Sequence, residues 1–205
     1  MRDTGTRLHE GGRSTTAGHP TLLDVFAPCP AFVLAETARV DVPADALYRA
    51  IGELRAADVR SPLVRTLVRA RGLPQTLRGH GHCPDLGETM LGERCVFLGE
   101  WPGEELVLGA AGRFWTAVPE WYEVTAESFR EFAHPRSGTI AMGFAVTPSE
   151  GTGCRLTIET RITVTDPAAR HAIARYWHVI RPAAWLTTRA LLDTMAARAV
   201  ALTGS

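Results

Sequence analysis

The sequence predicts one α+β domain in which a curved antiparallel β-sheet wraps around a long C-terminal α-helix. Apolar residues alternate with polar ones over 154–165, and this strand pattern leads directly into a long amphipathic helical pattern. A second alternating segment, 139–147, precedes the first across a short glycine-containing turn, which indicates antiparallel neighbours. Earlier segments add one strand and two helices. This order places several antiparallel strands before one long terminal helix that covers one face of the sheet.

The terminal helix is expected to start at Asp166-Pro167, a capping carboxylate followed by proline in the first turn. A single apolar stripe then continues to Met195. Pro182 lies inside the helix, where it removes one backbone hydrogen bond and crowds the preceding turn, so a kink or break is expected. The segment before Pro182 is expected to face a ligand, and the segment after it to serve packing.

The elements before the last third follow from similar patterns. Residues 32–42 alternate as a half-buried strand, and a helix is expected after Pro43. Ser61-Pro62 predicts the start of a second helix, which ends at Gly72. A hairpin around Pro102-Gly103 and a short capped helix over 125–132 complete the order. Residues 1–20 offer almost nothing to bury and predict a disordered tail, so the domain is expected to span 21–205.

Composition excludes several functional classes. The 22 cationic residues, all arginine, balance 22 acidic ones, so no global field favours nucleic acid. No apolar run reaches the length of a membrane span, and the N-terminal segment does not resemble a secretory signal. Four scattered cysteines without CxxC spacing are expected to be reduced thiols. We therefore expect a cytoplasmic protein without an integral membrane segment; whether it forms a homodimer stays open.

Several segments, taken together, resemble the START/polyketide-cyclase-like (SRPBCC) superfamily, and more narrowly an uncharacterised bacterial branch of it. They are PLVRTLVRARGLP, GEELVLGAAGRFW, FREFAHP leading into TIAMGFAV, RLTIETRITVTDPAAR and YWHVIRPAAWLTTRALL. The resemblance covers roughly residues 21–200. It implies the helix-grip fold and a cavity between sheet and terminal helix for a hydrophobic molecule of lipid, polyketide or isoprenoid type. It implies no single reaction, because members of one fold serve different functions.

Glu36 is the candidate catalytic residue and also a candidate ligand-binding residue. It shares one face of its strand with apolar neighbours, where a carboxylate must be paired or serve a function. Inside a cavity it would anchor a polar group of the ligand, or act as the acid of a cyclase- or dehydrase-type lyase. Alternatively, a bulge shifts the register, or an arginine pairs with Glu36 for structural reasons. A binding protein is favoured over an enzyme.

The other candidate ligand-binding residues come from the strands and the first part of the terminal helix. They are Trp115, Met142, Phe144, Thr160, Tyr176 and Ile180. Thr160 is expected to point inward with its apolar neighbours, and Glu159 and Arg161 to form an ion pair on the solvated face. If the phase of that strand is reversed, Glu159 and Arg161 line the cavity instead.

Three further patterns have weaker functional interpretations. His80, His82, Cys83 and Asp85 carry ligand types suited to zinc. A structural zinc site needs a fourth ligand, and no second paired cluster supports one, so a flexible loop over the cavity mouth is favoured. No metal and no cofactor are expected. The arginines of the Ser61 helix and of the terminal helix would suit a membrane-surface or partner-binding domain, although a solvated face is favoured. Gly109 to Gly112 matches no phosphate-binding loop, and no nucleophile motif is present.

Overall fold

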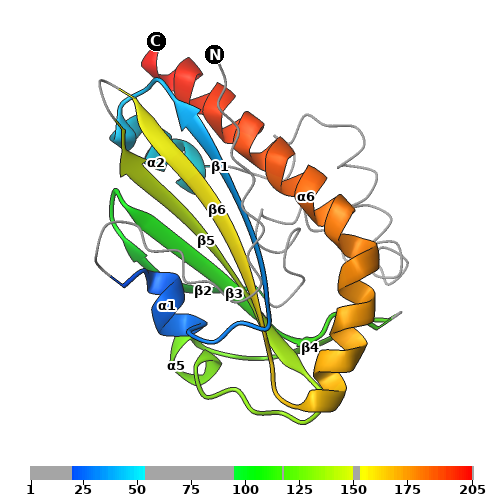
Figure 1. Ribbon diagram of the computed structural model, residues 1–205. Helices are drawn as coiled ribbons and strands as arrows, with labels where there is room; N and C mark the ends of the chain where they lie inside the picture. Colours follow the sequence, from blue (N-terminus) through cyan, green and yellow to red (C-terminus); the bar gives the residue numbers. More distant parts are fainter. Residues whose placement is uncertain (1–19, 54–94, 117, 150–152, 205) are drawn as a thin grey trace, which may run out of the picture.

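The computed structural model describes residues 20–53, 95–116, 118–149 and 153–204, and its centre is one antiparallel β-sheet (Figure 1). The sheet has the strand order β1-β6-β5-β3-β2, and β4 pairs with β3 beside this path. The bounds are β1 Phe32–Val40, β2 Val96–Trp101, β3 Glu105–Arg113, β4 Glu120–Tyr122, β5 Gly138–Pro148 and β6 Cys154–Val164. With the long terminal helix α6, Pro167–Thr203, this sheet confirms the predicted α+β class, and it is consistent with a helix-grip arrangement.

The register gives the sheet two distinct faces. Ile158 of β6 pairs with Glu36 of β1 on one side and with Phe144 of β5 on the other. Because side chains alternate along a strand, residues two apart share a face. The inner face, toward α6, carries Leu34, Glu36, Leu106, Leu108, Ile140, Met142, Phe144, Leu156, Ile158, Thr160 and Ile162; the outer face carries Glu105, Val107, Ala141, Glu159 and Arg161.

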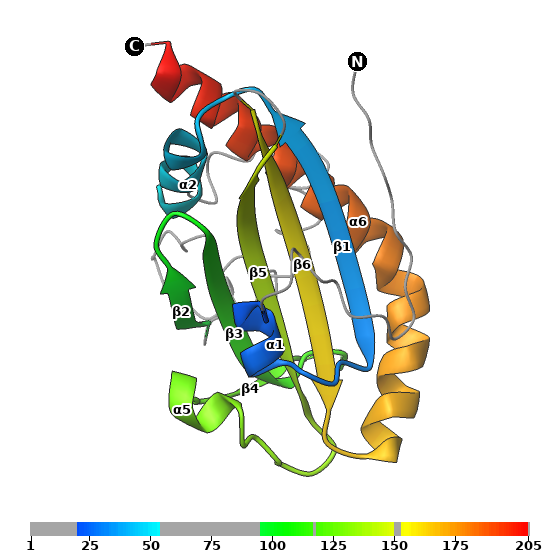
Figure 2. The same cartoon turned by 60° about the vertical axis from the view of Figure 1, so that its left-hand side comes forward.

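Helix α6 begins where the sequence predicts. The Asp166 side chain accepts a hydrogen bond from the backbone N–H of Ala169 at 2.8 Å, and Pro167 occupies the first turn. The expected kink or break at Pro182 is half right: the helix is continuous through Pro182, but its axis bends (Figures 1 and 2). Proline removes one hydrogen bond and crowds the turn before it, which bends a helix without ending it when both sides are packed.

Helix α6 covers the β1 and β6 side of the inner face. It packs against β1, β6 and the helix α2, Ala44–Gly52. Leu191 and Met195 of α6 are fully buried in the main apolar cluster together with Leu156 and Ile158. Figure 1 shows α6 running along the β1 side of the sheet. The packing role expected for the second segment of α6 is therefore observed.

Two short helices lie on the outer face; in Figure 2 the first lies in front of the sheet and the second lies below β2. The helix α1, Leu22–Phe26, follows a reciprocal capping box between Thr21 and Asp24. The helix α5, Ala126–Phe129, begins after the N-cap Thr125, as the sequence predicts. Leu23 and Phe129 pack with Val107 and other apolar residues into a second cluster on this face.

The remaining predictions are settled as far as the described residues extend. The hairpin around Gly103 is confirmed, with Gly103 at φ 84°, and the first predicted strand ends at Val40 rather than Val42. The predicted tail (residues 1–19) and the predicted helix from Ser61 lie outside the described residues. Among the described helices, none is long and apolar enough to cross a membrane.

Replacing Leu191 by alanine is expected to lower the free energy of unfolding by about 2–5 kcal/mol, because it leaves a cavity between α6 and the inner face. Urea unfolding followed by circular dichroism measures this loss. The matched control is Val200→Ala on the same helix, where the side chain is 54% exposed and the expected change is within about 0.5 kcal/mol. Equal losses in the two variants would contradict the described packing of α6.

Candidate functional site

The sheet residues predicted to bind a ligand all lie on the inner face, in two adjacent rows. Thr160 pairs with Met142 on β5, and its other neighbour is Leu34 on β1. The next row holds Glu36 and Phe144 on either side of Ile158. The expectation that Thr160 points toward the terminal helix is therefore correct, and these four candidates form one continuous patch.

Glu36 is buried beside α6, with an exposed fraction of 1%. Arg189 of α6 donates from Nη1 to Oε2 of Glu36 at 3.4 Å. The guanidinium lies 5.3 Å from the ring centroid of Trp185, a cation–π distance that holds it over the helix. Oε1 of Glu36, in contrast, has no hydrogen-bond partner among the described residues. Glu36 thus faces the apolar interior and has an arginine partner. The structural alternative, pairing with an arginine, is observed, and the ligand-binding role of Glu36 stays a prediction.

The candidates outside the sheet come from the end of β3 and from the first segment of α6. Trp115 follows the end of β3 and packs edge-on against Phe114, with ring centroids 5.1 Å apart. It belongs to the apolar cluster around Ile162 and Ile173, at the opposite end of the sheet from Val40. Tyr176 and Ile180 are half-buried on the first segment of α6. Trp115 therefore lies on the same face as Glu36, but the two residues are not neighbours.

The inner face keeps accessible apolar surface away from α6. Phe97 on β2 is 51% exposed, whereas Ile158 under α6 is fully buried. Between these extremes lie half-buried apolar side chains of the sheet and its edge: Leu106, Leu108, Ile140 and Trp121. Of the aromatic residues on α6, Trp177 is also half-buried and lies 5.9 Å from Phe32, centroid to centroid.

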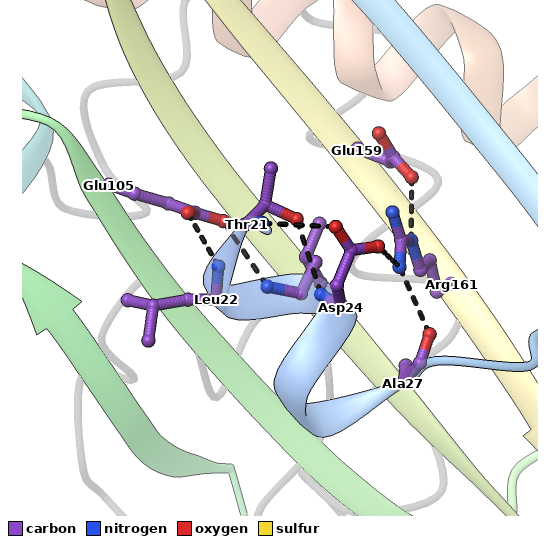
Figure 3. A network of polar contacts seen from close by, with 8 residues as sticks. Thr21, Leu22, Asp24, Ala27, Glu105, Glu159 and Arg161 are labelled. Carbon is purple, nitrogen blue, oxygen red and sulfur yellow. Dashed lines mark hydrogen bonds and ion pairs between the residues drawn. The ribbon is translucent and has the colours of Figure 1, made fainter. Parts of the chain in front are cut away.

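The prediction that Glu159 and Arg161 lie on a solvated face is wrong. The two residues point away from α6 as expected, but α1 buries them on the outer face (Figure 3). Arg161 donates from Nε to Glu159 at 2.6 Å and from Nη1 to Asp24 at 2.8 Å. It also donates to the carbonyl oxygen of Ala27 at 3.0 Å. A strand pattern shows which residues share a face, but not that a helix 137 residues away will cover it.

A third carboxylate, Glu105, fixes the start of α1. It accepts hydrogen bonds from the backbone N–H groups of Leu22 at 2.8 Å and Leu23 at 3.3 Å (Figure 3). These N–H groups have no partner within the helix, so the carboxylate satisfies them. Burial raises the pKa of Glu105, and this effect outweighs the hydrogen bonds and the positive charge of Arg161.

The other members of this network respond differently to burial. Burial opposes ionisation of Asp24, but hydrogen bonds from Arg161 and Thr21 outweigh it and lower the pKa of Asp24. Burial alone would lower the pKa of Arg161, whereas its hydrogen bonds to Glu159 and Asp24 raise it. A permanent cation surrounded by its hydrogen-bond acceptors needs no ligand. The network therefore anchors α1. In the sequence, the signal that could have located the start of α1 is the capping box formed by Thr21 and Asp24.

An open groove also lies on the outer face, between α1 and α5. Its volume is about 620 Å³, and it is lined by Val25, Phe26, Pro28, Ala126, Glu127, Arg130 and Glu131. No sequence pattern pointed to it, since its two walls come from short helices far apart in the chain. It is separate from the inner face, because the sheet lies between them.

Two groups of sequence candidates lie outside the described residues: the His80, His82, Cys83 and Asp85 cluster, and the arginines of the Ser61 helix. Among the described residues, no three His, Cys, Asp or Glu side chains are grouped to hold a metal ion. On α6, Arg189 and Arg198 form ion pairs with Glu36 and Glu53. These two cations are engaged within the domain rather than presented to a membrane.

Comparison with known proteins adds little to this geometry. No protein-family model and no curated protein matches the chain. Among solved structures, TTHA0849 from Thermus thermophilus aligns at 12% identity and a TM-score of 0.35, over 83% of this chain and 99% of that one. Norcoclaurine synthase from Thalictrum flavum aligns at 13% identity and a TM-score of 0.31, over 95% of this chain and 98% of that one. At such scores the fold assignment rests on the strand order and on α6 themselves.

Replacing Arg161 by methionine should lower the free energy of unfolding by about 3–5 kcal/mol, because it leaves buried carboxylates without their cation. Arg49→Met is the matched control, since Arg49 pairs with Asp45 at 3.3 Å on an exposed helix face and should cost less than about 1 kcal/mol. Chemical denaturation of both variants measures the difference. Comparable costs would show that the outer-face network does not anchor α1.

The pH dependence of the unfolding free energy should reveal the stabilising contribution of ionised Asp24. Because its folded pKa lies below the ordinary value of 3.8, its ionised form stabilises the fold fully above that value, and this contribution is lost as the pH falls through the folded pKa. The difference in unfolding free energy between the wild type and Asp24→Asn should therefore shrink as the pH is lowered from about 7 to about 3.

The unfolding free energy should depend on the ionisation of Glu105 with the opposite sign. Its raised pKa makes the wild type lose stability relative to Glu105→Gln as the pH rises from the ordinary value of 4.5 through the folded pKa. Urea titrations at several pH values follow both differences. The same slope for both variants would be inconsistent with the described network.

Proposed function

We propose that the chain binds a small hydrophobic molecule, of lipid, polyketide or isoprenoid type, between the inner face of the sheet and the first segment of α6. In this proposal it is a helix-grip protein of the START/polyketide-cyclase-like kind. The observation that carries the proposal is the half-buried apolar surface on the inner face, at Leu106, Leu108 and Ile140. Such surface is costly to leave in water and is typical of ligand sites.

The dimensions of the sheet support this location. Strands lie about 4.8 Å apart, so the five strands from β1 to β2 span roughly 19 Å. An α-helix with its side chains is about 10–12 Å wide, and α6 packs over the β1 and β6 side. Helix α6 alone therefore cannot cover the whole inner face. Among the described residues, α2 covers a further part beside β5, where Tyr48 donates to Glu100 of β2 at 2.7 Å, and Leu106 and Leu108 of β3 stay half-buried.

The chemistry of the lining also fits a mainly apolar molecule. The half-buried aromatic residues Trp121 and Trp177 offer flat surfaces, and Glu36 is the buried charge on this face beside α6. Few polar groups in an apolar wall are what a ligand site uses for orientation. The same carboxylate would be the acid in the alternative cyclase or lyase function, which also requires that the molecule binds here first.

Leu108→Glu should weaken the binding of a neutral apolar dye such as Nile red by about tenfold or more, because it places a charge on the proposed apolar surface. Leu108 is only half-buried, so the fold should tolerate the change. Fluorescence titration measures the dissociation constant, and circular dichroism checks the fold.

Val25→Glu is the matched control, because Val25 is 37% exposed and lines the groove on the outer face. This variant should bind the dye as the wild type does. If Val25→Glu weakens binding and Leu108→Glu does not, the ligand occupies the outer groove. If the wild type binds no dye, the proposed function is wrong.

A further inference from the structure

We propose that the ligand carries a neutral hydroxyl group, which donates a hydrogen bond to Oε1 of Glu36. This inference rests on the proposed function and narrows its ligand class to apolar alcohols and phenols, as opposed to free fatty acids and amines. It makes Glu36 a specificity-determining residue, whatever reaction follows.

The two carboxylate oxygens of Glu36 have unequal surroundings. Oε2 accepts from Arg189 at 3.4 Å, near the long limit of a hydrogen bond, and Oε1 accepts from no described residue. The side chain is 1% exposed, so bulk water does not reach Oε1. A buried acceptor without a donor is costly, which makes a ligand that supplies the donor preferable to one that does not.

The charges of Glu36 and Arg189 determine which hydrogen-bond donor on the ligand is preferred. Glu36 and Arg189 carry opposite charges and neutralise each other, and the adjacent inner-face residues Leu34 and Ile158 are apolar. An ionised carboxylate on the ligand has no proton to donate and would be repelled by Glu36. A protonated amine would add an unbalanced positive charge beside Arg189. A hydroxyl donates without either penalty.

Apolar side chains line the inner face of β1 between Glu36 and the first segment of α6. Phe32, which contacts Trp177 of α6, is half-buried and lies on the same strand face as Glu36. Four residues of extended strand separate them, or roughly 13 Å. In this proposal a medium-chain alcohol lies against the first segment of α6 with its hydroxyl end directed at Glu36, and the buried side chain of Leu34 between Phe32 and Glu36 moves aside.

The test compares four probes that share a ten-carbon chain: decanol, decyl methyl ether, decanoate and decylamine. Isothermal titration at neutral pH measures the dissociation constant of each for the wild type. Decanol should bind at least about tenfold more tightly than the ether, since the ether keeps the oxygen but lacks the proton that Glu36 accepts. Decanoate and decylamine should both bind more weakly than decanol.

Two variants test whether the preference for decanol over the ether arises at Glu36. Glu36→Met removes the acceptor at similar length and should bring the decanol-to-ether ratio close to one, while leaving binding of the ether unchanged or tighter. Glu105→Gln alters a buried carboxylate on the outer face and should keep the wild-type ratio.

The outcomes separate the inference from the function on which it rests. If no probe binds the wild type, the proposed function fails, and the inference fails with it. Equal binding of decanol and ether would overturn the inference alone, as expected if a bound water satisfies Oε1. Preference for decanoate or decylamine would overturn it too, and so would a ratio in Glu36→Met equal to that of the wild type.

Discussion

The structure depends on the packing of one helix, α6, against one side of the inner face. Leu191 and Met195 bury the apolar side chains of β6, and this contact fixes the helix over β1 and β6. Because one helix is narrower than five strands, α6 covers only part of the inner face, and α2 covers a further part beside β5. The bend near Pro182 then separates a packed second segment from a first segment whose Tyr176 and Ile180 stay half-buried.

The outer face carries a polar network that serves stability. There, one arginine and three carboxylates hold a five-residue helix that could not persist alone. The donors and acceptors of this network are largely matched within the domain. On the inner face, one carboxylate is buried with an oxygen that no described residue satisfies. A buried unmatched polar atom of this kind calls for a specific explanation, and the hydroxyl group of the proposed ligand supplies one for Glu36.

The sequence predicts what local rules determine. Alternation of period two gave the faces of β5 and β6, and Asp166-Pro167 gave the start of α6, because both depend on neighbouring residues. Two features could not be predicted. The burial of Arg161 depends on α1, which is too short to show periodicity, and the partner of Glu36 lies 153 residues away on α6. The candidate residues of the sheet were gathered correctly on one face, because strand phase alone decides that.

The central claim is that the accessible inner face receives the ligand. Methyl NMR on protein labelled at Leu, Ile, Val and Met measures this most directly, by detecting nuclear Overhauser effects between a bound neutral apolar probe and individual methyl groups. Binding at the inner face predicts contacts to Leu106, Leu108 and Ile140 and to Ile180 of α6. Contacts confined to Val25 and the other methyl groups of the outer groove would contradict it.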